Sequence, residues 1–250
     1  MNINYLTNPD FKDLEFLIKN IPENFDSTGI VIKNDRNEIR ITELNGIKVV
    51  AKSFKKVTVA NRIIYRFFRK SKAQRAYEYG LILKEKGINT PLPVGYIDQF
   101  SRFKLKKSYF ISLFVDNNSV FTAIKEAATE AERETILKEL AQFIFQTHSK
   151  GVFHRDLNMG NILYEKKENS GQFHLIDNNR MSFRKPSLSA RVNNLKYINL
   201  PIEQYAVLMV EYTRFLENPH YVLRRILHAQ ERQIKVKKIL NIIKKPFKIF

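Results

Sequence analysis

The feature that most constrains this chain of 250 residues is the run GVFHRDLNMGNIL over residues 151–163. It places His154, Arg155 and Asp156 in succession, and Asn161 follows the aspartate after four further residues. An amphipathic stretch precedes the run and an apolar stretch follows it, so we expect a polar loop between a helix and a strand. A chance polar turn would rarely hold so many positions in this order and spacing.

The run matches the H-R-D-L-x-x-x-N pattern of kinase catalytic loops at every fixed position. In that pattern the aspartate carboxylate meets the substrate hydroxyl, while the asparagine amide oxygen reaches a metal ion bound to the nucleotide. The chain resembles a kinase in this segment. The motif therefore predicts that Asp156 is the catalytic residue and that Asn161 is a metal ligand.

A second acidic position follows the loop. Asp177 comes directly after the apolar run 173–176, at the distance from Asp156 where kinases place the metal-binding aspartate of D-F-G. Because oxygen ligands suit Mg²⁺, we predict that Asp177 and Asn161 hold this ion. Two asparagines replace the Phe-Gly of that motif and no A-P-E sequence follows, which argues against a conventional protein kinase.

The N-terminal part predicts three antiparallel strands, over residues 29–32, 38–44 and 47–52. An Asn-Gly pair between the second and third is a strong signal for a two-residue hairpin turn. The third strand ends in Val-Val-Ala-Lys, a loose match to the V-A-I-K pattern of kinases. Lys52 is therefore the candidate for holding the nucleotide phosphates.

Two further features concern the nucleotide. Kinases pair the strand lysine with a glutamate on a helix, and Glu78 is the best placed acid for this, with Glu85 a weaker choice. The first hairpin contains no G-x-G-x-x-G sequence, although glycines are what let a backbone approach phosphate closely. If the turn over residues 34–37 covers the phosphates, we expect it to use asparagine and other side-chain donors.

The net charge of +18 is concentrated in two windows. Residues 48–75 contain ten basic residues and no acid, and residues 221–250 contain nine basic residues and one acid. A charge this segregated indicates an anionic partner at two places.

Residues 55–75 are predicted to form a basic amphipathic helix that continues to about residue 83. On this helix the apolar Ile63, Ile64, Phe67 and Phe68 gather opposite Arg62, Arg66, Arg69 and Lys70. Two interpretations remain open, an interfacial membrane helix and a helix packed on its own lobe with a solvated basic face. The lysine-rich run 233–250 has the same two interpretations, a membrane-surface tail or a basic helix that caps the second lobe.

Composition and hydropathy favour a cytoplasmic protein. The chain has no cysteine, which agrees with a reducing compartment. Residues 1–20 lack the basic-then-apolar order of a signal peptide. No apolar run approaches the length of a membrane span.

Taken together, four segments resemble the lipopolysaccharide core kinases, the Kdo/heptose kinase family, which is a bacterial branch of the protein-kinase-like fold. The segments are residues 71–78, 89–91, 154–163 and 176–183, and the resemblance extends over about residues 25–200. It implies an α+β fold with two lobes. Residues 1–115 would form a nucleotide-binding lobe with a small antiparallel sheet, and residues 116–250 a mainly helical catalytic lobe with a basic tail.

The resemblance further implies transfer of phosphate from ATP, with Mg²⁺, to a sugar hydroxyl of the lipopolysaccharide inner core. The implied acceptor is a Kdo residue linked to lipid A, at the cytoplasmic face of the inner membrane. Lys52, Glu78, Asn161 and Asp177 would bind the nucleotide and its metal, and Asp156 would be catalytic. An anionic membrane surface is the second expected partner.

Other interpretations stay open. The chain could be another small-molecule kinase of this fold, an atypical protein kinase, or a pseudokinase that binds lipid. The basic charge alone would allow nucleic acid, yet the sequence contains no recognised nucleic-acid-binding module, so we expect none. The residues do not distinguish Kdo from heptose as acceptor, and they do not indicate an oligomeric state.

Overall fold

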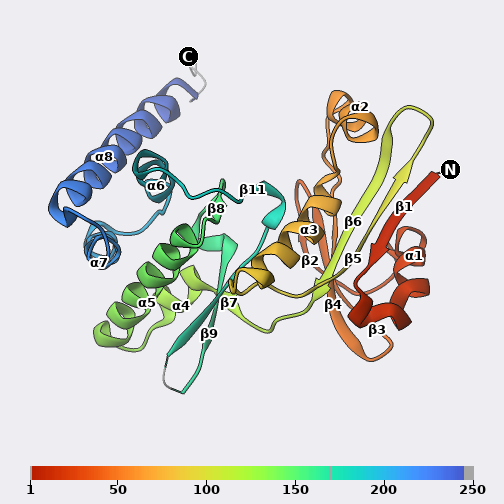
Figure 1. The fold of residues 1–250 in the computed structure, drawn as a ribbon, viewed down its shortest axis with the longest axis horizontal. Helices are drawn as coiled ribbons and strands as arrows, with labels where there is room; N and C mark the ends of the chain where they lie inside the picture. Colours follow the sequence, from red (N-terminus) through yellow and green to blue (C-terminus); the bar gives the residue numbers. More distant parts are fainter. Residues whose placement is uncertain (1, 169, 245–250) are drawn as a thin grey trace, which may run out of the picture. The chain divides into compact units, whose positions relative to one another are not determined.

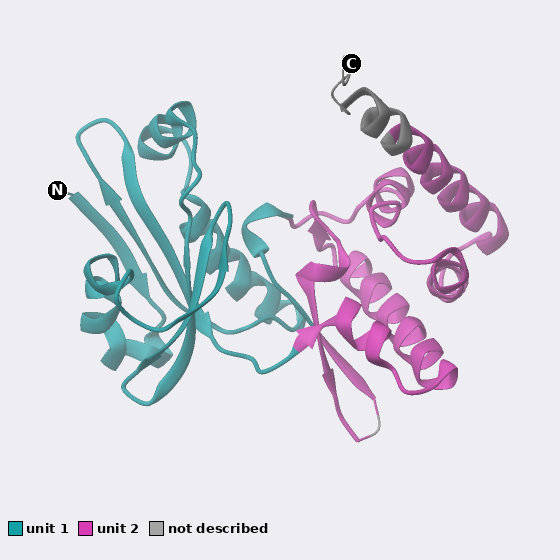
Figure 2. Cartoon of the chain, turned by 180° about the vertical axis from the view of Figure 1, so that it is seen from behind, with its two compact units in different colours: residues 1–117, 174–181 teal, residues 118–173, 182–250 magenta. Residues whose placement is uncertain are grey.

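The computed structural model describes residues 2–168 and 170–244, with side chains as far as residue 236. The chain divides into two compact units (Figure 2). Unit 1 holds residues 1–117 and 174–181, and unit 2 holds residues 118–173 and 182–250. The chain first leaves unit 1 within the polar run 116–119, and it later returns a short segment to it.

Unit 1 is built on a six-stranded antiparallel sheet with the strand order β1-β5-β6-β4-β3-β2 (Figure 1). Its elements are β1 (Asn2–Thr7), the 3₁₀ helix η1 (Pro9–Leu14), α1 (Glu15–Asn24), β2 (Ile30–Asn34), β3 (Glu38–Leu44), β4 (Ile47–Ser53), α2 (Val59–Phe67), α3 (Lys72–Glu85), β5 (Pro93–Phe100), β6 (Leu105–Leu113) and the 3₁₀ helix η3 (Asn178–Arg180).

Helices cover both faces of this sheet. One face packs on α1 through a cluster that includes Ile18 and Ile97, and the other packs on α3 through a cluster that includes Tyr77 and Tyr96. Neighbouring strand residues such as Tyr96 and Ile97 point to opposite faces, so every residue of β5 is buried. Ala51 belongs to the α1 cluster, and the next residue, Lys52, therefore points to the face that carries α3.

The structure differs from the prediction between residues 55 and 85, where one continuous helix was expected. Two helices, α2 and α3, stand there instead. Phe68 leaves the helical conformation, and the Ser71 side chain then accepts a hydrogen bond from the backbone N–H of Gln74, which starts α3 anew. A serine at this position satisfies a backbone donor that a continuous helix would not leave open, so the cap separates the two helices.

Other local predictions agree with the structure. The hairpin turn between β3 and β4 has both central residues in the left-handed region, with φ of 48° at Asn45 and 78° at Gly46. The long helix before the catalytic loop is present as α5, and the Thr129 side chain caps it by accepting from the N–H of Glu132. The Glu132 side chain in turn accepts from the N–H of Ala128, the residue before the cap.

Unit 2 is mainly helical. Its elements are β7 (Asn118–Ser119), α4 (Val120–Glu126), α5 (Glu130–Ser149), β8 (Phe153–His154), the 3₁₀ helix η2 (Met159–Asn161), β9 (Ile162–Lys166), α6 (Leu188–Leu195), α7 (Ile202–Thr213) and α8 (Pro219–Lys244). Strand β10 (Gly171–Leu175) begins in unit 2 and ends in unit 1, and β11 (Met181–Ser182) spans the opposite crossing.

The core of unit 2 lies where α5 packs on α7, and α6 and α7 both contact α8. Leu140, Ile144, Tyr205, Leu208 and Tyr212 are among its fully buried side chains. Within the described part of the chain, no helix combines the length and the apolar character needed to cross a membrane.

Candidate active site

Unit 1 brings together two of the predicted site residues. The Nζ of Lys52, at the end of β4, lies 2.6 Å from Oδ1 of Asp177, which precedes η3. Only 14% of the lysine side chain and 25% of the aspartate side chain are exposed, so water screens the pair less than it would at an open surface. The same oxygen of Asp177 accepts a hydrogen bond from Nδ2 of Asn179 at 2.6 Å.

The segment around Asp177 is held by hydrogen bonds to a loop that joins α3 to β5. Thr90 is the centre of this contact, because its hydroxyl donates to the carbonyl of Leu175 at 2.7 Å and accepts from Nδ2 of Asn178 at 2.8 Å. Asp177 itself has φ of 59°, in the left-handed region that aspartate tolerates better than most residues. Asn178 and Asn179, where D-F-G kinases have Phe-Gly, are both buried and hold this turn.

Glu78 was predicted to pair with Lys52, but in the structure it pairs with Lys70. Its two carboxylate oxygens each lie 2.8 Å from Nζ of Lys70, and one also accepts from Gln74 at 3.1 Å. The expected pair between Lys52 and Glu78 is not formed in the described structure, because Lys52 is bound to Asp177. The break between α2 and α3 explains the difference, since it places Lys70 beside the first turns of α3.

A second cation, which the motifs did not predict, lies near Asp177. Lys72 begins α3, and its Nζ lies 5.8 Å from the centre of the Phe54 ring, while Nζ of Lys52 lies 5.3 Å from the same ring. Desolvation lowers the pKa of Lys72, the nearby positive charge of Arg180 lowers it further, and the carboxylate of Asp177 opposes these effects. The sequence signal was weak, because a lysine at a helix start normally reads as a solvated charge.

Unit 2 brings together the other two predicted residues, in the loop from β8 to η2. The amide Nδ2 of Asn161 donates to the backbone carbonyl of Asp156 at 2.8 Å. This turns the amide oxygen of Asn161, the atom type that Mg²⁺ prefers, away from that carbonyl. Asn158 also donates to the Asp156 carbonyl, at 3.0 Å, and accepts from the N–H of Gly160 at 3.0 Å, so the loop is closed by its own asparagines.

A chain of neutral hydrogen bonds runs from the core of unit 2 to this loop. His154 accepts from the N–H of Asp156 through Nδ1 at 3.1 Å, and its carbonyl accepts from Nδ2 of Asn194 at 3.0 Å. Oδ1 of Asn194 lies 3.1 Å from Nε2 of His148, whose Nδ1 lies 2.8 Å from the Tyr212 hydroxyl. Because an amide oxygen can only accept, Nε2 of His148 carries the proton and Nδ1 accepts from Tyr212.

His148 is a buried histidine near the end of α5. Burial lowers the pKa of His148 to about 4, and the positive charge of Arg191 acts in the same direction. The imidazole therefore stays neutral at physiological pH, which its two hydrogen bonds require.

Asp177 in unit 1 and Asn161 in unit 2 each carry an oxygen donor, the type of ligand that Mg²⁺ prefers over nitrogen or sulfur. Within residues 2–168 and 170–244, no group of three or more histidine, cysteine or acidic side chains could hold a metal by itself. A nucleotide-bound Mg²⁺ does not need such a group, because it keeps several waters and takes phosphate oxygens alongside one or two protein ligands. Each of these residues, taken by itself, is therefore compatible with a metal that arrives with its nucleotide.

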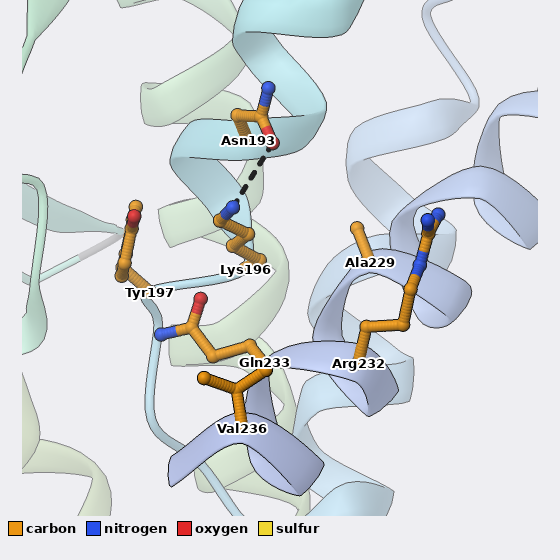
Figure 3. Close-up of a pocket in the computed structure, with 7 residues that line it drawn as sticks. All are labelled: Asn193, Lys196, Tyr197, Ala229, Arg232, Gln233 and Val236. Atoms are coloured by element: carbon orange, nitrogen blue, oxygen red, sulfur yellow. Dashed lines mark hydrogen bonds between the residues drawn. The ribbon is translucent and has the colours of Figure 1, made fainter. Parts of the chain in front are cut away.

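A groove of about 480 Å³ lies in unit 2 between α6 and α8 (Figure 3). Its lining residues are Asn193, Lys196, Tyr197, Ala229, Arg232, Gln233 and Val236. Lys196 donates to Asn193 at 3.1 Å on one wall, and Arg232 stands on the other. None of these seven residues was predicted as a site residue, and the groove shares none with the catalytic loop.

Comparison with known proteins agrees with this chemistry. Residues 46–218 match the model of the lipopolysaccharide kinase (Kdo/WaaP) family. A 3-deoxy-D-manno-octulosonic acid kinase of Pasteurella multocida (strain Pm70) is 29% identical over 119 residues, which are 47% of this chain and 49% of that protein. The match thus spans about half the length of this curated relative.

Among solved structures, "WaaP in complex with acyl carrier protein" superposes with a TM-score of 0.66 at 16% sequence identity, over 93% of this chain and 98% of that one. This likeness confirms the predicted kinase-like α+β fold, with an antiparallel sheet in the N-terminal part and a mainly helical C-terminal part. The family match covers well over half of the chain and confirms the resemblance drawn from the motifs. The chain therefore belongs to the lipopolysaccharide kinase (Kdo/WaaP) family.

Proposed function

We propose that this protein transfers the terminal phosphate of ATP to a sugar hydroxyl of the lipopolysaccharide inner core. The proposed acceptor is a Kdo residue linked to lipid A, at the cytoplasmic face of the inner membrane. The observation that carries this proposal is the ion pair between Lys52 and Asp177 in unit 1, together with the braced loop of Asp156 and Asn161 in unit 2. These are four of the five residues that the kinase motifs select.

Each of these residues has a distinct role in the proposed reaction. Asp156 orients the sugar hydroxyl and accepts its proton. Lys52 steadies the phosphates of the nucleotide, and Asn161 and Asp177 would hold Mg²⁺. The metal would neutralise charge on the phosphates, and the remaining contribution of the protein is positioning, which is most of what phosphoryl transfer needs.

The ion pair suggests how unit 1 receives the nucleotide. Lys52 binds Asp177 in the structure, and both groups would exchange this contact for the phosphates and the metal respectively. Lys72 is the second cation available for the phosphates. It lies beside the Phe54 ring, as Lys52 does, and the carboxylate of Asp177 interacts electrostatically with it. We assign Glu78 no contact with the nucleotide, since Lys70 and Gln74 bind it.

The test is a transfer assay with radiolabelled ATP, Mg²⁺ and Kdo-linked lipid A, run beside a heptose-containing core and a generic protein substrate. We expect label in the Kdo glycolipid and none in the protein. Asp156→Asn should retain ATP binding, measured by calorimetry, and lose transfer. Label in the heptose acceptor alone would move the acceptor assignment, and label in the protein alone would identify a protein kinase.

Absence of label with every acceptor, in a protein that still binds ATP or lipid, would support a pseudokinase instead. The matched control is Asp26→Asn, which removes an exposed carboxylate from unit 1 outside the motifs. It should transfer phosphate at the wild-type rate. A loss of activity in this control would show that Asp156→Asn reports charge loss in general and not the role of the catalytic loop.

A further inference from the structure

Unit 1 exposes large apolar side chains on α2 that the fold does not use. Val59, Ile63 and Phe67 follow one another at four-residue spacing, Ile64 is the next residue after Ile63, and Phe68 follows at the C-terminal cap of the helix. Phe67 is 54% exposed and Phe68 is 83% exposed. Only Tyr65 of this helix is buried, and Ile63 lies two residues from it, on nearly the opposite side. The helix therefore buries one ring, that of Tyr65, and turns its apolar side to solvent.

The tip of the hairpin between β5 and β6 extends the same surface. Tyr65 packs in one cluster with Phe100 and Leu105, the two residues that flank this tip, so α2 and the tip lie side by side (Figure 1). At the tip, the backbone N–H of Ser101 donates to the carbonyl of Lys104 at 2.9 Å, and the turn so closed presents Phe103 to solvent. Two segments that are distant in the sequence thus place exposed phenylalanines at one end of unit 1.

Cations surround these phenylalanines. The guanidinium of Arg66 lies 5.7 Å from the centre of the Phe67 ring, and that of Arg102 lies 5.1 Å from the centre of the Phe103 ring. Arg62, Arg66, Arg69 and Arg102 pair with no acidic side chain within the described residues. We define the basic-aromatic surface by its exposed apolar residues and its cations. The apolar residues are Val59, Ile63, Ile64, Phe67, Phe68 and Phe103, and the cations are these four arginines and the exposed Lys106 of β6.

We propose that the basic-aromatic surface is the part of this protein that docks on an anionic lipid bilayer. Its phenylalanines would enter the boundary between headgroups and acyl chains, and its arginines would meet lipid phosphates. The structure thereby decides between the two interpretations that the sequence left open for this helix, because the apolar side is exposed and not packed on the sheet. Charge complementarity selects the occupant, since residues 48–75 contain no acid that would repel anionic lipid.

The inference rests on the proposed function only in that a lipid-linked acceptor lies in such a bilayer. Its test therefore uses vesicles without any sugar acceptor. We expect the full chain to co-sediment with vesicles of phosphatidylethanolamine and phosphatidylglycerol, to bind phosphatidylcholine vesicles far more weakly, and to be released by salt. A protein that binds these vesicles but transfers no phosphate would contradict the proposed function and support the docking surface.

Two sets of variants locate the binding. Phe67→Ser with Phe68→Ser should weaken binding roughly 30-fold, because two phenylalanines no longer leave water. The matched control, Phe16→Ser with Phe121→Ser, removes two exposed phenylalanines elsewhere and should bind like the wild type. Equal binding by both double variants would overturn the proposal.

A second comparison uses two triple variants that each remove three positive charges, so the two variants have the same net charge. Arg69→Gln, Arg102→Gln and Lys106→Gln together should weaken binding to anionic vesicles roughly 100-fold. Lys33→Gln, Lys125→Gln and Lys138→Gln remove the same charge from other exposed positions and should weaken it much less. Equal losses would show attraction by net charge only and would reject a specific surface.

The chain contains no tryptophan, so a single one can report contact with lipid. Phe68→Trp and Phe103→Trp should each shift their fluorescence to shorter wavelength on vesicles and be quenched by brominated lipid, while Phe16→Trp should not. The fluorescence shift could instead appear without vesicles, together with a molecular mass that rises with protein concentration. If Phe67→Ser with Phe68→Ser abolished that rise, the occupant would be a second copy of the chain. A shift only with a small acidic protein would identify a protein partner, and either result would overturn the lipid assignment.

Discussion

The two units orient their candidate aspartates by different physical means. In unit 1, Asp177 is held by the cation of Lys52 at 2.6 Å and by one amide. In unit 2, the loop of Asp156 is held by neutral hydrogen bonds that lead back through Asn194 to His148. An ion pair can exchange partners when phosphates arrive, whereas a neutral buried network holds one geometry throughout. The difference suits a residue that must take up a metal and a residue that must only stay in place.

The units also differ in the titratable group that each one buries. Unit 1 buries Asp98, which is fully inaccessible and whose carboxylate oxygens accept no well-formed hydrogen bond from any residue that the structure describes. Desolvation raises the pKa of Asp98 to about 6, and the hydroxyls of Ser108 and Ser71 oppose this only in part. Unit 2 buries His148, whose pKa burial lowers to about 4. Both groups prefer to be neutral, so the two units should respond to pH in opposite directions.

The largest expected effect concerns the metal carboxylate. Asp177→Asn should lower kcat by about 1,000-fold, because the ligand charge that would neutralise the metal is lost while the shape is kept. The measurement is the rate of phosphate transfer as a function of Mg²⁺ concentration. The Asp26→Asn control should leave that dependence unchanged. Full activity for Asp177→Asn at ordinary Mg²⁺ would remove this residue from the site.

Lys52→Met should lower the transfer rate by about 100-fold or more, since it removes the cation that both holds Asp177 and would steady the phosphates. Lys72→Met should have a smaller effect of the same kind, visible mainly in KM for ATP. Lys56→Met is the control, because this exposed lysine lies just after β4, on the connection to α2 and outside the site. If Lys52→Met and Lys56→Met give the same transfer rate, the charge of Lys52 has no specific role in the reaction.

The third prediction concerns His148 and the stability of unit 2. Its folded-state pKa of about 4 lies below the ordinary 6.5, so its contribution is present above pH 6.5 and is lost as pH falls through 4. The loss amounts to about 3 kcal/mol at 1.36 kcal/mol per pKa unit. Hydrogen exchange of α5 as a function of pH measures it.

His148→Leu should remove that pH dependence at a cost of about 2 kcal/mol, because Asn194 and Tyr212 lose their partner. It should also lower kcat more than it changes KM for ATP, since the imidazole positions the catalytic loop through Asn194. An unchanged kcat would assign the network to stability alone. A pH dependence that survives in this variant would assign the effect to another group.

The smallest expected effect concerns Asp98 in unit 1. Its folded-state pKa lies above the ordinary 3.8, so the stability of unit 1 is greatest below that value and is lost as pH rises through about 6. Asp98→Asn should therefore stabilise unit 1 by about 2 kcal/mol above pH 7, somewhat less than the full shift implies because the new amide is also buried. Urea unfolding at pH 5 and pH 8 measures the difference. A variant that is less stable at pH 8 would show that the ionised carboxylate has a partner.

The sequence predicted well wherever local chemistry decides the outcome. The turn at Asn45 needs positive φ at two positions, and α5 needs a cap and early acids, so both could be predicted from a few neighbouring residues. The catalytic loop was identified from its motif, because the residues of the motif are close together in the chain, and part of its hydrogen bonding is local. The β1 strand was not predicted, since pairing with β5 and not local preference makes it a strand.

The sequence by itself determined the family and the approximate positions of β2, β3 and β4. It also selected Lys52, Asp156, Asn161 and Asp177 as site candidates. Only the tertiary structure decided which partner each side chain meets. It gave Glu78 to Lys70, placed Lys72 beside Phe54, and left the apolar side of α2 in solvent beside a distant hairpin. The physical reason is that motifs and caps depend on spacing along the chain, whereas ion pairs and exposed surfaces depend on which segments fold against each other.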